Sequence, residues 1–313
     1  MDKNILSSKS MYTSFSLPID PILLLKRRQR RVHLLKFLKE SLLDLQKQFQ
    51  KYDFKNEKTK SNYDNFNVSG KLVFLFGGTS SIIKHIIQKD RDIEAIFVNR
   101  DYTPYSRKRD SLIKIICEMF NVDFIECPDI LINEPEDILN SNNKPFKVFS
   151  QYYNKAIEIQ LRRENFFDKK KLLENITSFD IQKLVNINNI KVISNLDKFF
   201  FLIDSENTDL LYTLPIVLGS RERYYNLLLD LKNRHKKSNI DNEKNSFDYS
   251  SSHLSLYLKF GLCSIREVYS AVMRELGHNH PLLRQLYWRD FLYILHSISR
   301  LYLIVLFKKD IEI

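Results

Sequence analysis

Short apolar runs alternate with stretches of helical spacing in the first half of the chain. Three of these runs are typical of buried strands: residues 71–76, 95–98 and 122–125. Apolar residues recur at helical spacing between them, at residues 80–87 and 111–120. The order strand, helix, strand, helix, strand is the signature of a parallel α/β sheet. The pattern therefore predicts an α/β fold for this part of the chain.

Further helices are predicted on either side of this region. Leucines at helical spacing predict an amphipathic helix before it: Leu34, Leu35, Leu38, Leu42 and Leu45. A second apolar face follows Gly219-Ser-Arg221 and is made by Tyr224, Leu227, Leu228 and Leu231. Residues 1–20 show no clear periodicity, and residues 154–215 are charged and poorly periodic. We therefore expect a connecting segment and then a helical region.

Composition limits the class of protein. A chain of 313 residues has the length of about two domains, and 43% hydrophobic residues exclude a disordered protein. The three cysteines, Cys117, Cys127 and Cys263, have no metal-ligand spacing, which indicates free thiols in a reducing compartment. The first residues lack the apolar core of a signal peptide, and the apolar run 292–307 is interrupted by polar residues and too short to span a bilayer. The sequence predicts a soluble intracellular protein of the cytoplasm or nucleus, with no membrane partner.

The charge of the chain favours a polyanionic partner. Lysine and arginine number 49 against 38 aspartate and glutamate, which gives a net charge of +11. Such a charge favours nucleic acid as the partner before a membrane surface. A lysine-rich composition without a function gives the same charge, so the charge by itself leaves both interpretations open.

Two segments in the last third of the chain carry candidate chemistry. Serines cluster at the expected start of a helix: Ser250, Ser251, Ser252 and Ser255. A helix N-terminus with added hydroxyls is a good cradle for a phosphate, although serines there more often act only as caps. The only tryptophan, Trp288, is followed by Arg289 and Asp290. An aromatic face beside a cation suits a planar ring or an unstacked base, and the alternative is a core residue next to a salt bridge.

In their order and spacing, these segments resemble the flavin-binding domain of the DNA photolyase/cryptochrome family. In that family a Thr/Ser-Ser-x-Leu-Ser-x-Tyr-Leu-x-x-Gly-x-x-Ser-x-Arg segment precedes a Leu-x-Trp-Arg-Asp/Glu-Phe segment, and here they correspond to residues 250–269 and 282–291. The sequence NRDYTPYSRKRD at residues 99–110 resembles a block of the family's α/β domain, and residues 144–153 resemble the segment that ends that domain. The resemblance covers most of residues 32–298.

The resemblance implies a fold of two domains. We expect a Rossmann-like, parallel-sheet α/β antenna domain at residues 1–156, an interdomain connection at 157–216 and the N-terminal part of an all-helical FAD-binding domain at 217–313. No counterpart of the family's first strand and first helix is expected before Arg31, and the chain leaves the family pattern beyond Ile298. Both domains are therefore expected to be incomplete.

The resemblance also implies a function, that of a deoxyribodipyrimidine photolyase. Such an enzyme repairs UV-induced cyclobutane pyrimidine dimers in DNA by light-driven electron transfer from reduced FAD, and the lesion must be flipped out of the stacked duplex. By motif, the FAD contacts are Ser251, Ser252, Leu254, Ser255, Gln285 and Arg289. Trp288 and Gln285 are the implied catalytic and DNA-binding residues, with Trp288 stacking on the lesion and Gln285 hydrogen-bonding the pyrimidine edge.

Departures from the family pattern keep other functions open. Gln285 stands where members that act on cyclobutane dimers commonly have Glu, and Gln occurs in relatives that repair (6-4) lesions. Ile240 stands where the family often has a Tyr that touches the FAD phosphate. The alternatives are an inactive fragment that binds DNA, one part of a split enzyme completed by a second polypeptide, and a cryptochrome-like protein. Cys117-Glu118 resembles a pterin-contacting pair, so the antenna chromophore could be methenyltetrahydrofolate or a deazaflavin.

Overall fold

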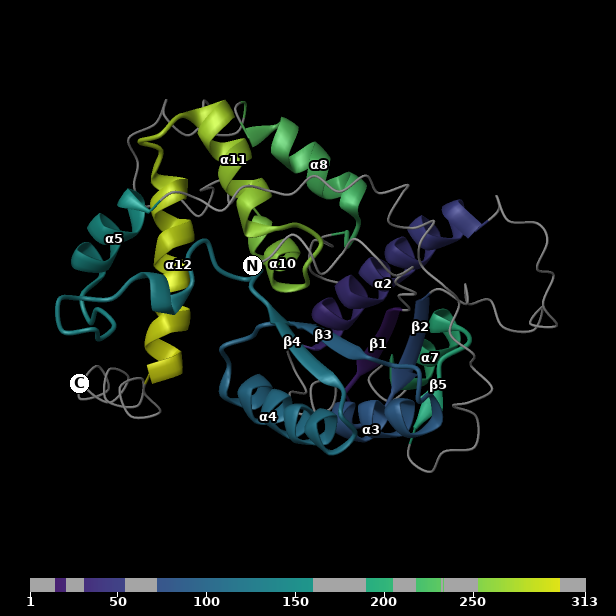
Figure 1. Ribbon diagram of the computed structural model, residues 1–313. Helices are drawn as coiled ribbons and strands as arrows, with labels where there is room; N and C mark the ends of the chain where they lie inside the picture. The colour runs from purple at the N-terminus through teal and green to yellow at the C-terminus, as the bar shows by residue number, and fades with distance from the viewer. Residues whose placement is uncertain are drawn as a thin grey trace, which may run out of the picture. The chain divides into compact units, whose positions relative to one another are not determined.

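The computed structural model describes two compact units of mixed α/β structure, with parallel strands followed by helices (Figure 1). The described residues are 15–20, 31–53, 72–159, 190–204, 218–231, 233 and 253–298. The first unit comprises Met1–Ile93, Met119–Asn121 and Asn165–Arg221, and the second comprises Glu94–Glu118, Val122–Glu164 and Glu222–Ile313. Neither unit is a continuous stretch of chain. The expected division into residues 1–156, 157–216 and 217–313 stays a prediction.

The sheet of the first unit is built around one buried strand. Strand β2 (Leu72–Phe76) lies between β1 (Phe15–Ile19) and β5 (Lys191–Val192). β1 pairs with β2 in parallel, and β5 pairs with β2 in the antiparallel direction. A strand that is covered on both faces needs apolar residues at successive positions, which explains the uninterrupted apolar run in the sequence.

Strand β1 corrects the expectation that no strand precedes Arg31. Its sequence, FSLPI, is short and contains Pro18, which lacks a backbone donor and obscures the strand pattern. The proline is tolerated because β1 is an edge strand of the described sheet. The parallel β1 and β2 are connected through the predicted amphipathic helix, α2 (Arg31–Asp53), as a parallel pair requires a crossover.

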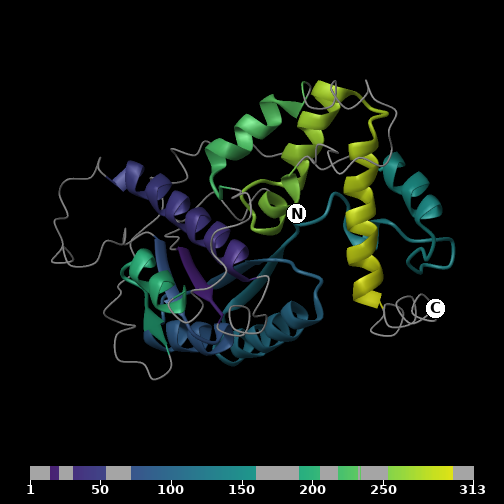
Figure 2. The same ribbon diagram turned by 180° about the vertical axis from the view of Figure 1, so that it is seen from behind.

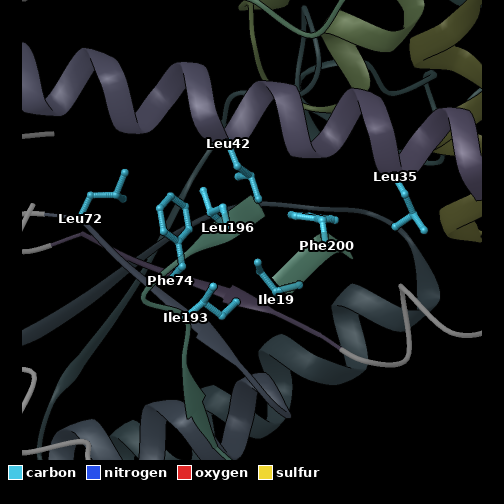
Figure 3. Close-up of a cluster of buried hydrophobic side chains, with 8 residues drawn as sticks. All are labelled: Ile19, Leu35, Leu42, Leu72, Phe74, Ile193, Leu196 and Phe200. Carbon is cyan, nitrogen blue, oxygen red and sulfur yellow. The ribbon is translucent and has the colours of Figure 1, made fainter. Parts of the chain in front are cut away.

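Helices cover both faces of β2. On one face, α2 and α7 (Leu196–Asp204) contribute to a buried cluster of Ile19, Leu35, Leu42, Leu72, Phe74, Ile193, Leu196 and Phe200 (Figure 3). On the other face, α3 (Thr79–Lys89) contributes to a cluster of Val73, Leu75, Ile82, Ile86 and Ile190. The side chains of β2 alternate between the two clusters, as the pleat of a strand requires.

Part of the expected interdomain connection belongs to this core. β5 and α7 both lie within residues 157–216, and α7 buries Leu196 and Phe200 against α2. A strand of two residues and a helix of nine residues give too weak a periodicity to stand out from a charged stretch.

The second unit begins with a parallel pair of strands. β3 (Ala95–Asn99) and β4 (Asp123–Cys127) are joined through α4 (Pro104–Met119), which begins seven residues before the predicted helix because Pro104 can occupy the first helical position. In the described part of the chain, β3 and β4 hydrogen-bond to each other and not to β2. The three predicted strands are therefore real, but the single sheet inferred from them is divided.

The helices of the second unit follow this pair. They are η1 (Pro135–Asp137), α5 (Phe149–Glu158), α8 (Arg221–Leu229), α10 (Leu254–Lys259), α11 (Ile265–Leu276) and α12 (Pro281–Ile298). The predicted apolar face is confirmed, since Tyr224, Leu227 and Leu228 of α8 are buried, as is Leu231 just beyond its end. α5 lies beside α12 in both views (Figure 2), and α12 also packs against α11. Helix α12 is thus held by two neighbours.

Candidate functional site

Helix α12 divides its residues between a buried face and an exposed stripe. The buried face consists of Leu282, Leu283, Leu286, Tyr287, Asp290, Phe291 and Ile294. The exposed residues Arg284, Gln285, Trp288 and Leu292 follow one another at helical spacing and form one stripe. Two of the residues singled out from the sequence, Gln285 and Trp288, therefore lie together on the outer face of α12.

The Trp288 ring is held from one side and open on the other. Its centroid lies 4.5 Å from that of Phe149 on α5, in an edge-to-face arrangement, and 5.9 Å from that of Phe291. The side chain is nevertheless 46% exposed. Trp288 is thus half-exposed rather than buried in the core. A rigid, half-exposed indole is a suitable platform for stacking a base.

Arg289 points toward the segment that follows β4. Its Nη1 donates to the carbonyl oxygen of Ile130 at 2.9 Å and to Asp290 Oδ1 at 2.9 Å. The guanidinium carbon lies 5.0 Å from the centroid of the Tyr293 ring, and the side chain is 22% exposed. The guanidinium therefore has protein partners, while part of it remains accessible to a ligand.

Asp290 is the buried member of the Trp-Arg-Asp sequence. Its side chain is 0% exposed, and its Oδ2 accepts a hydrogen bond of 2.6 Å from the backbone N–H of Ile132. Burial raises the pKa of Asp290 to about 7, against the opposing effects of the Arg289 charge and the Ile132 N–H, and the negative charge of Glu134 adds to the increase. Sequence reasoning identified the salt bridge of Asp290 but not this backbone contact, which needs a partner 158 positions away.

Residues 128–134 connect the helices to the strand pair. Arg266 of α11 contacts the carbonyl oxygen of Pro128 at 3.5 Å and Asp129 at 3.4 Å, in addition to the contacts that Arg289 and Asp290 make further along. The segment ends at Glu134, which is buried. Nothing in the local sequence indicates this role, because the contacts come from helices that follow more than a hundred residues later.

Glu134 takes part in an ionic network at the carboxyl end of β3. Its Oε2 accepts from Arg100 at 3.1 Å and from the hydroxyl of Tyr102, while Arg100 also binds Glu136 at 2.5 Å. Burial and the hydrogen bond to Glu134 raise the pKa of Tyr102 above its usual range. The hydrogen bond to Glu136 likewise raises the pKa of Arg100. Tyr102 therefore stays protonated and Arg100 stays charged.

A cavity of about 330 Å³ adjoins this network. Basic, acidic and aromatic side chains line it, among them Arg100, Tyr102, Arg107, Lys114, Phe124 and Glu136. Residues 99–110, the block that resembles the family's α/β domain, contribute to its lining. Asp101 has a structural role, because it accepts from the Thr103 N–H at 2.9 Å and from the Ser106 hydroxyl at 2.8 Å. The neighbouring cavity has room for a small ligand.

The serine cluster is only partly described. Ser250, Ser251, Ser252 and Ile240 lie outside the described residues. Leu254 is buried in the first turn of α10, and Ser255 is exposed there. The residue at the N-cap is His253, in a left-handed conformation with φ of 54° and without a side-chain cap hydrogen bond, rather than a serine. Ser255 is therefore accessible, and the cradle as a whole stays a prediction.

The predicted free thiols are confirmed. Cys117, Cys127 and Cys263 form no disulfide bond in the described part of the chain. Cys117 is buried in α4, whereas the adjacent Glu118 is exposed. In the described part of the chain no helix is long and apolar enough to span a membrane.

Known proteins are similar to this chain in sequence and in fold. The DNA photolyase family model matches residues 60–169, and the deoxyribodipyrimidine photo-lyase of Alkalihalophilus pseudofirmus is 22% identical over 237 residues, or 72% of this chain and 45% of the relative. The chain is thus similar to members of the DNA photolyase/cryptochrome family in part of its sequence and in its fold. It spans less than half the length of this photolyase relative. The match to the family model ends at residue 169, before α12 begins. It therefore does not test the candidate site residues on α12.

Two solved structures of family members share the fold. The archaeal photolyase of Sulfolobus tokodaii, which carries two FAD molecules, matches with a TM-score of 0.59 and 23% identity over 92% of this chain and 54% of that one. The cryptochrome of Synechocystis matches with a TM-score of 0.61 and 17% identity, over 92% of this chain and 56% of that one. Photolyases and cryptochromes thus match the fold about equally well.

Proposed function

We propose that this chain is part of an intracellular deoxyribodipyrimidine photolyase, which uses light and reduced FAD to repair cyclobutane pyrimidine dimers in DNA. The observation that carries the proposal is the half-exposed ring of Trp288 beside the exposed amide of Gln285 on α12. The photolyase motif that this segment resembles has a tryptophan at the position of Trp288, and relatives have Glu or Gln at the position of Gln285. The net charge of +11 supports a DNA partner.

Trp288 and Gln285 would bind a lesion that has been flipped out of the duplex. Stacking of a base on an aromatic ring contributes about 1–3 kcal/mol, and the exposed side of Trp288 is available for it. Phe149 and Phe291 hold the other side, so the ring does not need to be ordered when the lesion binds. Gln285, one turn earlier, can both donate to and accept from the edge of a pyrimidine.

The described residues are compatible with a flavin nucleotide. Ser255 is exposed, and its hydroxyl suits a phosphate. The motif adds Ser251 and Ser252, which lie outside the described residues, and Leu254 as further contacts. Arg289 and Gln285 of α12 would contact the cofactor, and Asp290 and Ile130 hold the Arg289 guanidinium in place for it. Reduced FAD, when bound, would supply an electron that splits the two bonds of the dimer ring and would take it back afterwards.

The cavity beside Arg100 is the proposed site of an antenna chromophore. Its volume of about 330 Å³ lies at the lower end of the range for small-molecule sites. Phe124 offers aromatic surface to a pterin or deazaflavin ring, and Lys114 offers a cation to a carboxylate or phosphate. Methenyltetrahydrofolate and a deazaflavin both have such a ring and such an anionic group.

An absorption spectrum tests the flavin part of the proposal. The purified chain is mixed with FAD, desalted and scanned, and flavin bands that survive desalting are the expected result. If the chain stays colourless, the spectrum is repeated with a second polypeptide that supplies further helices of a photolyase. Absence of flavin bands in both experiments contradicts the proposal of a flavin enzyme.

A repair assay tests the reaction. The flavin-loaded protein is illuminated with an oligonucleotide that contains one cyclobutane dimer, and the recovery of intact pyrimidines is measured. Trp288→Ala should lose repair but keep the flavin bands, because its ring is assigned to the lesion. Gln285→Glu should increase repair, because a carboxyl group is common at this position in family members that act on this lesion. Repair of a (6-4) lesion alone would instead support the second candidate function, which the amide of Gln285 favours.

A further inference from the structure

Arg284 is exposed next to Trp288 and lacks the acidic partner that other arginines of the same unit have. On α11 and α12, Arg266 pairs with Asp129, Arg274 with Glu275 and Arg289 with Asp290. No carboxylate among the described residues forms an ion pair with Arg284. Its positive charge is therefore available to an anion from outside the described structure.

Aromatic rings of α5 hold the Arg284 guanidinium in place. Its central carbon lies 5.3 Å from the centroid of the Phe149 ring and 5.2 Å from that of Tyr153. A guanidinium that rests on rings keeps its N–H groups free for hydrogen bonds, and it loses less conformational freedom when it binds a ligand. Arg284 is thus ordered without being neutralised.

Phe149 brings Arg284 and Trp288 onto one surface. The same Phe149 ring that lies under Arg284 contacts the Trp288 ring at 4.5 Å. Arg284 and Trp288 are separated by one helical turn, where side chains on the same face of a helix have their β-carbons about 5–6 Å apart. A nucleotide whose base stacks on Trp288 would therefore direct its sugar and phosphate within the reach of a long side chain one turn away.

We propose that Arg284 binds a backbone phosphate of the nucleic-acid strand whose base stacks on Trp288. This inference rests on the proposed function, because it requires nucleic acid at α12. The guanidinium can donate two parallel hydrogen bonds to the phosphate oxygens, which a lysine ammonium cannot reproduce. Arg284 positions the strand, while Trp288 and Gln285 contact the base.

The salt dependence of binding tests the phosphate contact. The affinity of the full chain for a fluorescein-labelled single-stranded oligonucleotide is measured by anisotropy between about 50 and 200 mM salt, because each phosphate contact to a single strand contributes a slope of about −0.7 to log K against log salt. Arg284→Gln should make this slope shallower by about 0.7 and weaken binding several-fold at the lowest salt. Arg284→Lys should keep the slope but bind more weakly than the wild type.

Arg274→Gln is the matched control. It removes the same charge from an exposed arginine of the neighbouring helix, but this arginine is already paired with Glu275. Its slope should equal that of the wild type. If Arg284→Gln and Arg274→Gln have the same slope as the wild type, the phosphate contact is refuted.

Trp288→Ala separates this inference from the proposed function. Loss of binding in Trp288→Ala together with an unchanged slope in Arg284→Gln refutes the Arg284 contact and leaves the DNA site in place. A shallower slope in Arg284→Gln together with normal binding by Trp288→Ala shows that Arg284 binds a phosphate but overturns the proposal that this phosphate belongs to a nucleotide stacked on Trp288. If the wild-type chain binds no oligonucleotide, both proposals are wrong.

Discussion

Replacing Asp290 by alanine removes the carboxylate that joins α12 to the segment after β4. The backbone N–H of Ile132 then loses its acceptor. Ile132 is buried, with only 1% of its surface exposed. Arg289 loses its ion pair but keeps the carbonyl oxygen of Ile130. The change thus leaves one buried donor unpaired and one partly buried charge with a single partner.

The expected loss of stability follows from these two effects. A buried backbone donor without a partner costs about 1–3 kcal/mol. Breaking a fully buried ion pair costs about 3–5 kcal/mol, but the Arg289 side chain is 22% exposed, so water reduces its share. We therefore expect Asp290→Ala to lower the free energy of unfolding by about 2–4 kcal/mol in total. For a unit of this size each kcal/mol lowers Tm by about 2–4 °C.

Thermal unfolding followed by circular dichroism measures the loss. Glu275→Ala is the matched control, because Glu275 also pairs with the arginine before it but on an exposed surface, where the loss is below about 1 kcal/mol. Asp290→Asn keeps an oxygen that can accept from the Ile132 N–H and should lose less than Asp290→Ala. If Asp290→Ala and Glu275→Ala unfold at the same temperature, the buried contacts of Asp290 do not stabilise the protein and the reasoning is refuted.

The pKa of Asp290 adds a dependence on pH. In the folded protein it is raised to about 7, whereas an aspartate in an unfolded chain has a pKa of about 3.9. The folded state therefore holds this proton more tightly, so the contribution of Asp290 to the free energy of unfolding falls as pH rises from about 4 to 7 and is constant above that. Asp290→Asn cannot ionise. Its Tm relative to the wild type should rise from about pH 5 to pH 8, and a constant difference would contradict the raised pKa.

Three further substitutions, two of them with a matched control, test the packing by chemical denaturation. Gly219→Ala should destabilise the protein by about 1–3 kcal/mol, because the new Cβ would lie 2.3 Å from the Phe37 carbonyl oxygen. Gly78→Ala is the control and should be neutral, because the nearest atom to its new Cβ would be 3.7 Å away. Equal denaturation midpoints for the two variants would contradict the close approach at Gly219. Phe74→Ala should cost about 3–5 kcal/mol by opening a cavity in the core, and Phe97→Ala, whose ring is 51% exposed, should cost much less. Tyr102→Phe should cost about 1–2 kcal/mol, since buried Glu134 then keeps only Arg100, and an unchanged midpoint would refute this hydrogen bond.

The elements with strong periodicity were predicted correctly from the sequence. The apolar run of β2, the leucine face of α2 and the buried face of α8 all appear as predicted, because burial of one face imposes a period on the residues. Strand β1 was missed because Pro18 interrupts its pattern. β5 and α7 were missed because they are short, and their burial is decided by β2 and α2, which come much earlier in the chain.

The candidate site, like the fold, was predicted from the sequence only in part. The motif around Trp288 identified the helix and the residue types, and residues 99–110 identified the carboxyl end of β3, next to which the cavity lies. The motif could not show that Asp290 binds the Ile132 N–H, that Glu134 joins Arg100 and Tyr102, or that Phe149 lies between Arg284 and Trp288. These contacts join residues more than thirty positions apart.

The sequence by itself determined the class of fold, the family that the chain resembles and the residue types that α12 can offer, because these depend on local period and on the spacing of residues within one helix. Only the tertiary structure decided which of those side chains face solvent and which are neutralised. Trp288 and Asp290 are two positions apart on one helix, yet the first is 46% exposed and the second is fully buried. The physical reason is that burial and charge pairing depend on the packing of α5, α11 and residues 128–134 around α12, and that packing is a property of distant parts of the chain.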